Sequence, residues 1–134
     1  MLEPYLYFNG QCAEALAFYT EALGATVEFQ MRYGDSPEPI PGKPDGWDDK
    51  LMHASFQVAG QRVMAADAAN ASAFGGFALS VSLDDEADVR RTFEALSEGA
   101  EIIMPVGATF WSKAFGMLKD RFGVSWMVTL AQAE

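Results

Sequence analysis

The segment that most constrains the fold of this chain is a pair of extended runs around a short turn. The runs are Lys113–Lys119 and Val124–Leu130, and Asp120-Arg121-Phe122-Gly123 lies between them. Strand-forming residues on both sides of a four-residue connection that ends in glycine are typical of a β-hairpin. The sequence therefore predicts two antiparallel strands here, rich in aromatic side chains.

Two helices are predicted, one in each half of the chain. The first spans Gln11–Leu23, and Gly24 follows it as a residue that accepts the left-handed backbone of a helix C-terminus. The second spans about Asp85–Ser97, with Asp84 or Asp85 as the cap of its first turn. Their apolar stripes recur every three or four residues: Cys12, Leu16, Tyr19 and Leu23, then Val89, Phe93 and Leu96.

The other periodic segments indicate strands. Besides the hairpin, these are Glu3–Phe8, Ala25–Tyr33, Leu51–Val58, Arg62–Ala66, Phe77–Leu83 and Glu101–Met104. Each helix is thus preceded by one strand and followed by three. The predicted class is α+β, with two tandem βαβββ modules over about residues 1–67 and 76–131 of a single domain, 1–134.

Composition narrows the possible partners and location. The 134 residues carry a formal net charge of −10, which disfavours nucleic acid and anionic membranes. No apolar run is long enough to span a membrane, and the start, Met1-Leu2-Glu3-Pro4, does not read as a signal peptide. The single cysteine, Cys12, excludes an intrachain disulfide. We therefore expect a cytoplasmic protein.

One long segment has no periodicity. Gly34–Lys50 holds four of the six prolines, together with Trp47. Loops of this length are usually lids, interface arms or disordered segments. We expect this arm at a subunit interface or folded over a cavity.

Four segments resemble the PhnB-like branch of the vicinal-oxygen-chelate superfamily, which includes the glyoxalases and bleomycin-resistance proteins. They read PYLYFNGQCAEALAFYTEALGA, LMHASFQVAGQRVMAAD, FALSVSLDDEADV and TFWSKAFGMLKDRFGVSWMV. The resemblance covers nearly the whole chain. It implies a glyoxalase-like fold, in which the two curved mixed sheets enclose a cavity, and a homodimer. It does not identify a reaction.

In the metal-dependent members of this superfamily, one divalent ion is bound by four cavity-facing positions, on the first and last strands of each module. Carried over to this sequence, the positions fall on Pro4, Ala65, Gly76 and Met127. None of these side chains offers an oxygen or an imidazole nitrogen to a cation. Shifting the register by one residue adds only Glu3 as a plausible ligand. We therefore expect no metal and no cofactor.

His53, the only histidine, is the candidate catalytic residue. Along Leu51–Val58 apolar residues alternate with His53, Ser55 and Gln57, which predicts that these three face the cavity. Functionally, His53 would act as a general base or as a hydrogen-bond donor to a ligand. The alternative is a half-buried structural histidine satisfied by a neighbour.

The rest of the expected cavity wall is small and mildly polar. Ser80 falls on the same side of its strand as Gly76, Ala78 and Ser82. Met127 falls on the same side of its strand as Ser125 and Thr129. Leu6 and Phe8 are expected to add apolar surface, and Trp111 to lie at the mouth. Such a wall suits a small organic molecule. Alternatively, the space is a closed core or is filled by water.

Three other features have a structural interpretation. Among Phe110, Trp111, Phe115, Phe122 and Trp126, core packing or dimer contact is expected for most, with Trp126 beneath the second helix. Asp67 would cap the following turn, although it is also placed to orient His53 or bind a cation. Cys12 is expected to be an inert thiol.

Three functions remain open from the sequence. The first is a PhnB-like protein that binds a small organic molecule without metal. The second is a lyase, isomerase or dioxygenase type of enzyme with a non-standard site around His53. The third is a protein that sequesters a drug or metabolite. A methyltransferase label carried by the family is not adopted, because no strand–glycine-rich loop–helix nucleotide site is present.

Overall fold

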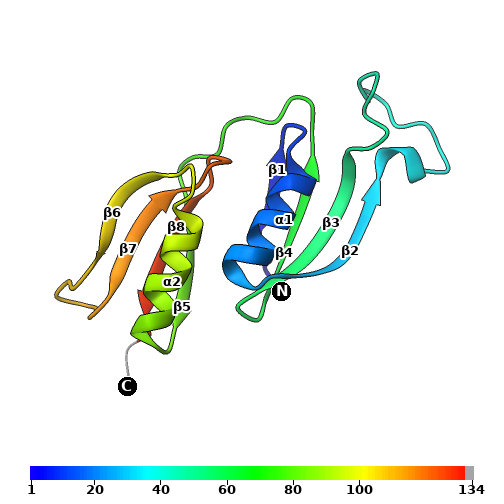
Figure 1. Cartoon of the computed structure of the whole chain (residues 1–134). Helices are drawn as coiled ribbons and strands as arrows, with labels where there is room; N and C mark the ends of the chain where they lie inside the picture. Colours follow the sequence, from blue (N-terminus) through cyan, green and yellow to red (C-terminus); the bar gives the residue numbers. More distant parts are fainter. Residues whose placement is uncertain (132–134) are drawn as a thin grey trace. The chain divides into compact units, whose positions relative to one another are not determined.

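The chain forms two compact units, Met1–Ser72 and Ala73–Glu134, each with one helix and one four-stranded sheet (Figure 1). The structure is a computed structural model that describes residues 1–131. We refer to the two parts as the first unit and the second unit. No helix within the described residues is long and apolar enough to cross a membrane.

The first unit has the order strand, helix and three strands. Its elements are β1 (Tyr5–Phe8), α1 (Cys12–Leu23), β2 (Thr26–Arg32), the short 3-10 helix η1 (Tyr33–Asp35), β3 (Leu51–Val58) and β4 (Gln61–Asp67). The strands lie in the order β1-β4-β3-β2. β1 runs parallel to β4, and the other neighbours are antiparallel.

The second unit repeats this arrangement. Its elements are β5 (Leu79–Leu83), α2 (Glu86–Leu96), β6 (Glu101–Gly107), β7 (Phe115–Lys119) and β8 (Ser125–Leu130). The sheet order is β5-β8-β7-β6, with β5 parallel to β8. The predicted tandem βαβββ organisation is thereby confirmed, and so are both helices and all eight strands to within a few residues.

The helix ends follow the local chemistry of the sequence. Gly24 adopts the left-handed conformation (φ 66°) and closes α1 by donating its N–H to the Tyr19 carbonyl. Asp85, not Asp84, caps α2, since its carboxylate accepts the Ala87 N–H at 2.7 Å.

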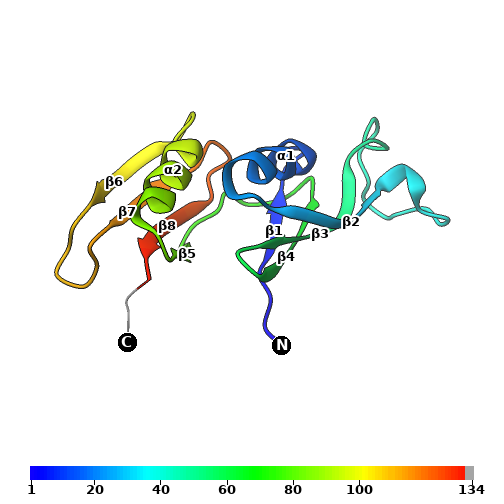
Figure 2. The ribbon, with the colours of Figure 1, turned by 60° about the horizontal axis from the view of Figure 1, so that its bottom comes forward.

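Each helix covers one face of its own sheet (Figure 2). In the first unit this face carries Leu6 and Phe8, both 2% exposed, together with Ala54, Phe56 and Val58. The prediction that Leu6 and Phe8 line a cavity was therefore wrong, because they alternate with Tyr5 and Tyr7 and it is the tyrosines that face the other way.

In the second unit the buried face carries Leu118, Val128 and Trp126. The Trp126 indole N–H donates to the buried carboxylate of Asp120 at 2.9 Å. The same carboxylate accepts the backbone N–H groups of Phe122 and Val124, and so fixes the hairpin turn. The predicted hairpin and the core position of Trp126 are confirmed.

The proline-rich arm between β2 and β3 is tied to the first unit at its base. The Tyr33 and Gly34 N–H groups donate to the carbonyls of Lys50 and Asp48, each at 2.9 Å. Trp47 packs its ring edge-on against Tyr33, with 5.8 Å between the ring centroids. The role of the arm at an interface or over a cavity stays a prediction.

Candidate functional site

The face of the first sheet that points away from α1 presents three rows of side chains across β1, β4, β3 and β2. Successive rows are two residues apart along each strand, or about 7 Å. The first row holds Glu3, Arg62, Gln57 and Glu28; the second holds Tyr5, Met64, Ser55 and Phe29; the third holds Tyr7, Ala66, His53 and Met31. The prediction that His53, Ser55 and Gln57 share the face opposite the helix is confirmed.

A hydrogen bond links two rows of this face. The Tyr5 hydroxyl lies 3.0 Å from His53 Nδ1. Burial, followed by the neighbouring Tyr7, raises the pKa of the Tyr5 hydroxyl, so the phenol keeps its proton. In one ring tautomer the hydroxyl donates to His53 Nδ1 and Nε2–H is a donor; in the other, Nδ1–H donates to the hydroxyl and Nε2 is an acceptor. No hydrogen bond to Nε2 is found within residues 1–131, which leaves one polar ring nitrogen open on this face.

Aromatic rings surround this pair. The Tyr5 and Tyr7 rings stack with centroids 4.8 Å apart, and the Phe29 ring lies 5.9 Å from His53. Tyr5, Tyr7 and Phe29 are 36%, 52% and 51% exposed. We call Tyr5, Tyr7, Phe29 and His53 the aromatic strip. The tyrosines were missed in the sequence because the register was counted from Pro4, which put Leu6 and Phe8 on the open face.

The first row is a polar border beside the aromatic strip. Arg62 Nε lies 3.5 Å from Glu3 Oε2 and 3.8 Å from Glu28 Oε1. Gln57 Nε2 donates to Glu28 Oε1 at 3.2 Å, so this predicted ligand-binding residue is already engaged. The arrangement places charged groups at one end of the face and rings at the other.

The corresponding face of the second sheet has a different character. Ser80 on β5 pairs with Met127 on β8, and Met127 pairs with Met117 on β7. The prediction that Ser80 and Met127 share a face is borne out by this register. This row carries no aromatic side chain, whereas tyrosines lie on the matching first strand, β1, of the first unit.

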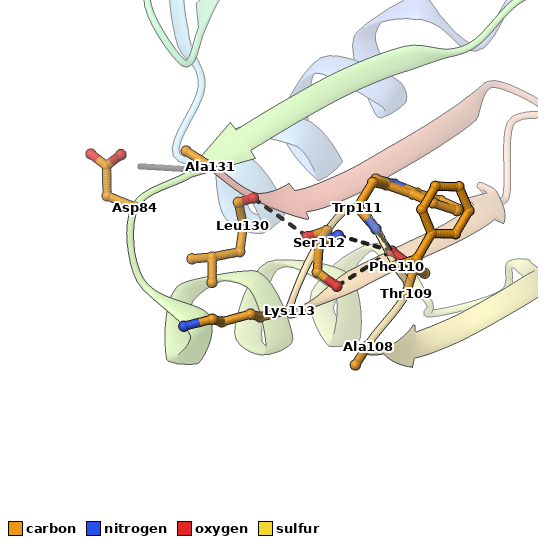
Figure 3. Close-up of a pocket in the computed structure, with 9 residues that line it drawn as sticks. All are labelled: Asp84, Ala108, Thr109, Phe110, Trp111, Ser112, Lys113, Leu130 and Ala131. Carbon is orange, nitrogen blue, oxygen red and sulfur yellow. Dashed lines mark hydrogen bonds between the residues drawn. The ribbon is translucent and has the colours of Figure 1, made fainter. Parts of the chain in front are cut away.

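Trp111 belongs to a pocket at one end of the second unit (Figure 3). The pocket has a volume of about 620 Å³ and lies where β5 and β8 end, beside the connection between β6 and β7. Its lining residues are Asp84, Ala108, Thr109, Phe110, Trp111, Ser112, Lys113, Leu130 and Ala131. Ser80 and Met127 are not among them, so within this unit the predicted site residues fall in two separate places.

Comparison with known proteins decides the family. The sequence model of the Glyoxalase/Bleomycin resistance protein/Dioxygenase superfamily matches residues 2–128. The chain belongs to this superfamily. The match spans both units, and the observed elements are those expected of a glyoxalase-like chain.

Several members of the superfamily are similar over nearly their whole length. The crystal structure of protein PA1353 from Pseudomonas aeruginosa shares 43% identity, covers 99% of this chain and 100% of its own, and has a TM-score of 0.86. The PhnB protein from Bacillus cereus, titled a putative 3-demethylubiquinone-9 3-methyltransferase, shares 32% identity with coverage of 97% and 98% and a TM-score of 0.80. Protein YjdN of Escherichia coli K12 is 32% identical over 142 residues, or 99% of this chain and 97% of that protein.

The residues found here do not suit the divalent ion that metal-dependent members of the superfamily bind. Ala65 is fully buried on the opposite side of β4, and Gly76 precedes β5, so these two carried-over positions were wrong. On the open faces the register instead pairs Tyr5 with Met64 and Ser80 with Met127. Taken unit by unit, a phenol beside a thioether and a hydroxyl beside a thioether are each a poor donor set for a hard or borderline cation. Among the described residues, no group of three or more His, Cys, Asp or Glu side chains lies together.

Asp67 serves the framework of the first unit. Its carboxylate is buried and accepts the N–H groups of Cys12, at the start of α1, and of Leu51, at the start of β3. The sequence had suggested that Asp67 caps the following turn or orients His53. In the structure its carboxylate does neither. Burial, followed by the nearby Asp67 charge, raises the pKa of the Cys12 thiol to about 12, which makes this thiol a poor nucleophile.

The predictions for the remaining aromatic residues had different outcomes. Phe115 is buried at 8% exposure, as expected for a core residue. Phe110 is 97% exposed and does not pack in the core, so a dimer contact, the other expected role, stays a prediction for it. It lies on the connection before β7, where no helix covers it, and its ring contacts that of Trp111.

Proposed function

We propose that this protein binds a small organic molecule on the aromatic strip of the first unit, without a metal ion. The observation that carries the proposal is the Tyr5–His53 hydrogen bond of 3.0 Å among exposed rings. It sets a polar group, the Nε2 nitrogen of His53, within an apolar surface. Ligand sites commonly combine aromatic walls with a few placed polar groups.

The chemistry of the strip favours a ligand with a flat, apolar part and a hydrogen-bonding group. Tyr7 and Phe29 offer ring area on either side of His53, and aromatic contacts add affinity beyond the area that they bury. The Ser55 hydroxyl, in the row of Tyr5, offers a further polar contact. These ring contacts and polar groups would be sufficient for a protein that sequesters a drug or metabolite.

The same hydrogen bond favours a second candidate, an acid–base enzyme of the lyase or isomerase type. A tyrosine and a histidine in contact are able to move a proton between substrate and solvent. A ligand that is bound and recovered unchanged indicates a binding protein. A ligand that is chemically converted indicates an enzyme.

We also propose that the protein acts as a cytoplasmic homodimer. In each sheet a strand with exposed apolar side chains lies at an edge: β2 carries Phe29, and β6 carries Ile103, which is 56% exposed. Natural proteins usually cover such edges. Sedimentation of the purified chain tests this proposal, and a monomer at micromolar concentration would contradict it.

The binding proposal is tested with a library of small aromatic compounds screened by saturation-transfer NMR. Compounds that bind the wild type are then titrated calorimetrically against Tyr5→Phe and His53→Ala. We expect each variant to weaken binding about tenfold, as loss of one directional hydrogen bond implies. Glu98→Ala, an exposed change in the second unit, is the matched control.

Equal affinities for the wild type, Tyr5→Phe and His53→Ala would remove the proposal. Thermal melting of the same samples separates lost binding from lost folding. If His53 is only structural, its substitution lowers the melting temperature and leaves the affinity unchanged.

A further inference from the structure

The pocket around Trp111 has a chemistry of its own. All of its lining residues belong to the second unit, and none of them belongs to the aromatic strip of the first. Its volume of about 620 Å³ lies within the range of small-molecule sites. In Figure 3 the rings of Phe110 and Trp111 stand at one side of the pocket and Asp84 at the other, with Lys113 between them.

The connection that carries the rings is held in place by hydrogen bonds. The Thr109 hydroxyl accepts the N–H groups of Trp111 and Ser112, and the Thr109 N–H donates to the Ser112 carbonyl at 2.8 Å. Ser112 is buried, and its hydroxyl contacts the Ala114 carbonyl and the Thr129 hydroxyl at 2.9 and 3.1 Å. The pocket wall is thus organised before any ligand arrives, which lowers the entropy lost on binding.

The two rings project from this fixed connection. Trp111 is 42% exposed and rests edge-on against the buried Phe115, with 5.3 Å between centroids. Phe110 meets Trp111 edge-on at 4.7 Å and is 97% exposed. Trp111 is therefore anchored on one side and open on the other, and Phe110 contributes little to the core.

The two charged side chains that line the pocket differ from the paired charges of α2. Nearby acids on α2 have partners: Glu86 pairs with Arg90, and Asp88 pairs with Arg91. Asp84 and Lys113 form no ion pair and no side-chain hydrogen bond within the part of the chain that the structure describes. The pocket therefore carries one carboxylate and one ammonium group, both available.

We propose that this pocket binds a small zwitterion with an aromatic side group, the chemistry of an aromatic amino acid. Lys113 would meet the carboxylate of the ligand, Asp84 its ammonium group, and Trp111 with Phe110 its ring. A simple anion would be repelled by Asp84 and by a chain of net charge −10, and a simple cation would leave Lys113 unmatched. A neutral ligand with both charges suits both side chains.

The test uses L-phenylalanine, N-acetylphenylalanine and phenylalaninamide as probes, titrated into the full chain and followed by NMR. The acetyl compound lacks the ammonium charge, and the amide lacks the carboxylate. We expect phenylalanine to bind at millimolar concentration or below, and each blocked compound to bind at least tenfold more weakly.

Three variants assign the contacts. Asp84→Asn should abolish the preference for phenylalanine over N-acetylphenylalanine, and Lys113→Gln the preference over phenylalaninamide. Trp111→Ala should weaken all three probes. Asp45→Asn and Lys119→Gln are matched controls at exposed positions outside the pocket, and melting curves confirm that each variant is folded.

Two results would overturn the proposal. One is the absence of phenylalanine binding at millimolar concentration. The other is binding that does not distinguish the three probes or that survives all three pocket variants.

Discussion

The two units share one topology but expose different chemistry. In both, the first strand runs parallel to the last and the helix covers one face. On the opposite face the first unit displays the aromatic strip, whereas the paired row Ser80, Met127 and Met117 of the second carries no aromatic side chain. The comparison teaches that the repeat fixes the helix-covered core, while the open face is free to vary in function.

A second contrast concerns one buried aspartate in each unit. Asp67 joins the starts of α1 and β3, which are far apart in the sequence. Asp120 instead closes a local turn and holds the indole of Trp126. The two carboxylates occupy different places in equivalent frameworks, so their loss should affect the units differently.

The largest expected effect is that of Asp120→Ala. The change leaves two backbone N–H groups and the Trp126 indole N–H without this acceptor, and each buried orphan costs about 1–3 kcal/mol. We expect a loss of about 3 kcal/mol or more in the free energy of unfolding, measured by urea denaturation. Asp45→Ala, an exposed change, is the control, and a loss below about 1 kcal/mol for Asp120→Ala would contradict the assignment.

The next largest effect is a loss of folding stability at alkaline pH, which arises from Cys12 in the first unit. The pKa of Cys12 rises from 9.0 to about 12 on folding, so its contribution to stability is complete below pH 9 and is lost as the pH approaches 12. Each pH unit in this window lowers the free energy of unfolding by up to about 1.4 kcal/mol.

Chemical denaturation at a series of pH values measures this slope in the wild type and in Cys12→Ala. We expect the variant to lack the part that begins near pH 9. Burial also raises the pKa values of Tyr5 and Tyr33 above 10.0, so a smaller slope above pH 10 should persist in the variant. Identical slopes in both proteins would show that Cys12 is not responsible.

The smallest expected effect is that of a chelator. Because the open faces of both units lack a suitable donor set, EDTA should leave the melting temperature unchanged, and elemental analysis should find no stoichiometric Zn, Ni, Mn or Fe. One equivalent of metal in the purified protein would refute this expectation.

Much of the fold could be predicted because its signals are local. Leu51–Val58 was predicted with the bounds that the structure shows, since its alternation and its flanking turn lie within a few residues. The strands of the hairpin around Asp120 were predicted to within two residues for the same reason. The fold therefore followed from periodicity and turn chemistry.

The site was less predictable because its determinants are not local. In YLYF every residue is aromatic or aliphatic, so the pattern alone does not say which pair faces the core, and counting from Pro4 chose wrongly. The role of Asp67 depends on Cys12 and Leu51, which only the folded chain brings together. The pocket around Trp111 likewise depends on where β5 and β8 end.

The two buried aspartates also bear on the order in which the chain folds. The three hydrogen bonds of the Asp120 carboxylate join residues that are two, four and six positions apart in the sequence. Those of Asp67 join residues that are 16 and 55 positions apart. Short loops close at a smaller entropic cost and contacts of low sequence separation form faster. We therefore expect amide protons of the β7–β8 hairpin to become protected from exchange early in refolding, before those of Cys12 and Leu51, so that two similar folds in one chain reach their native states at different rates.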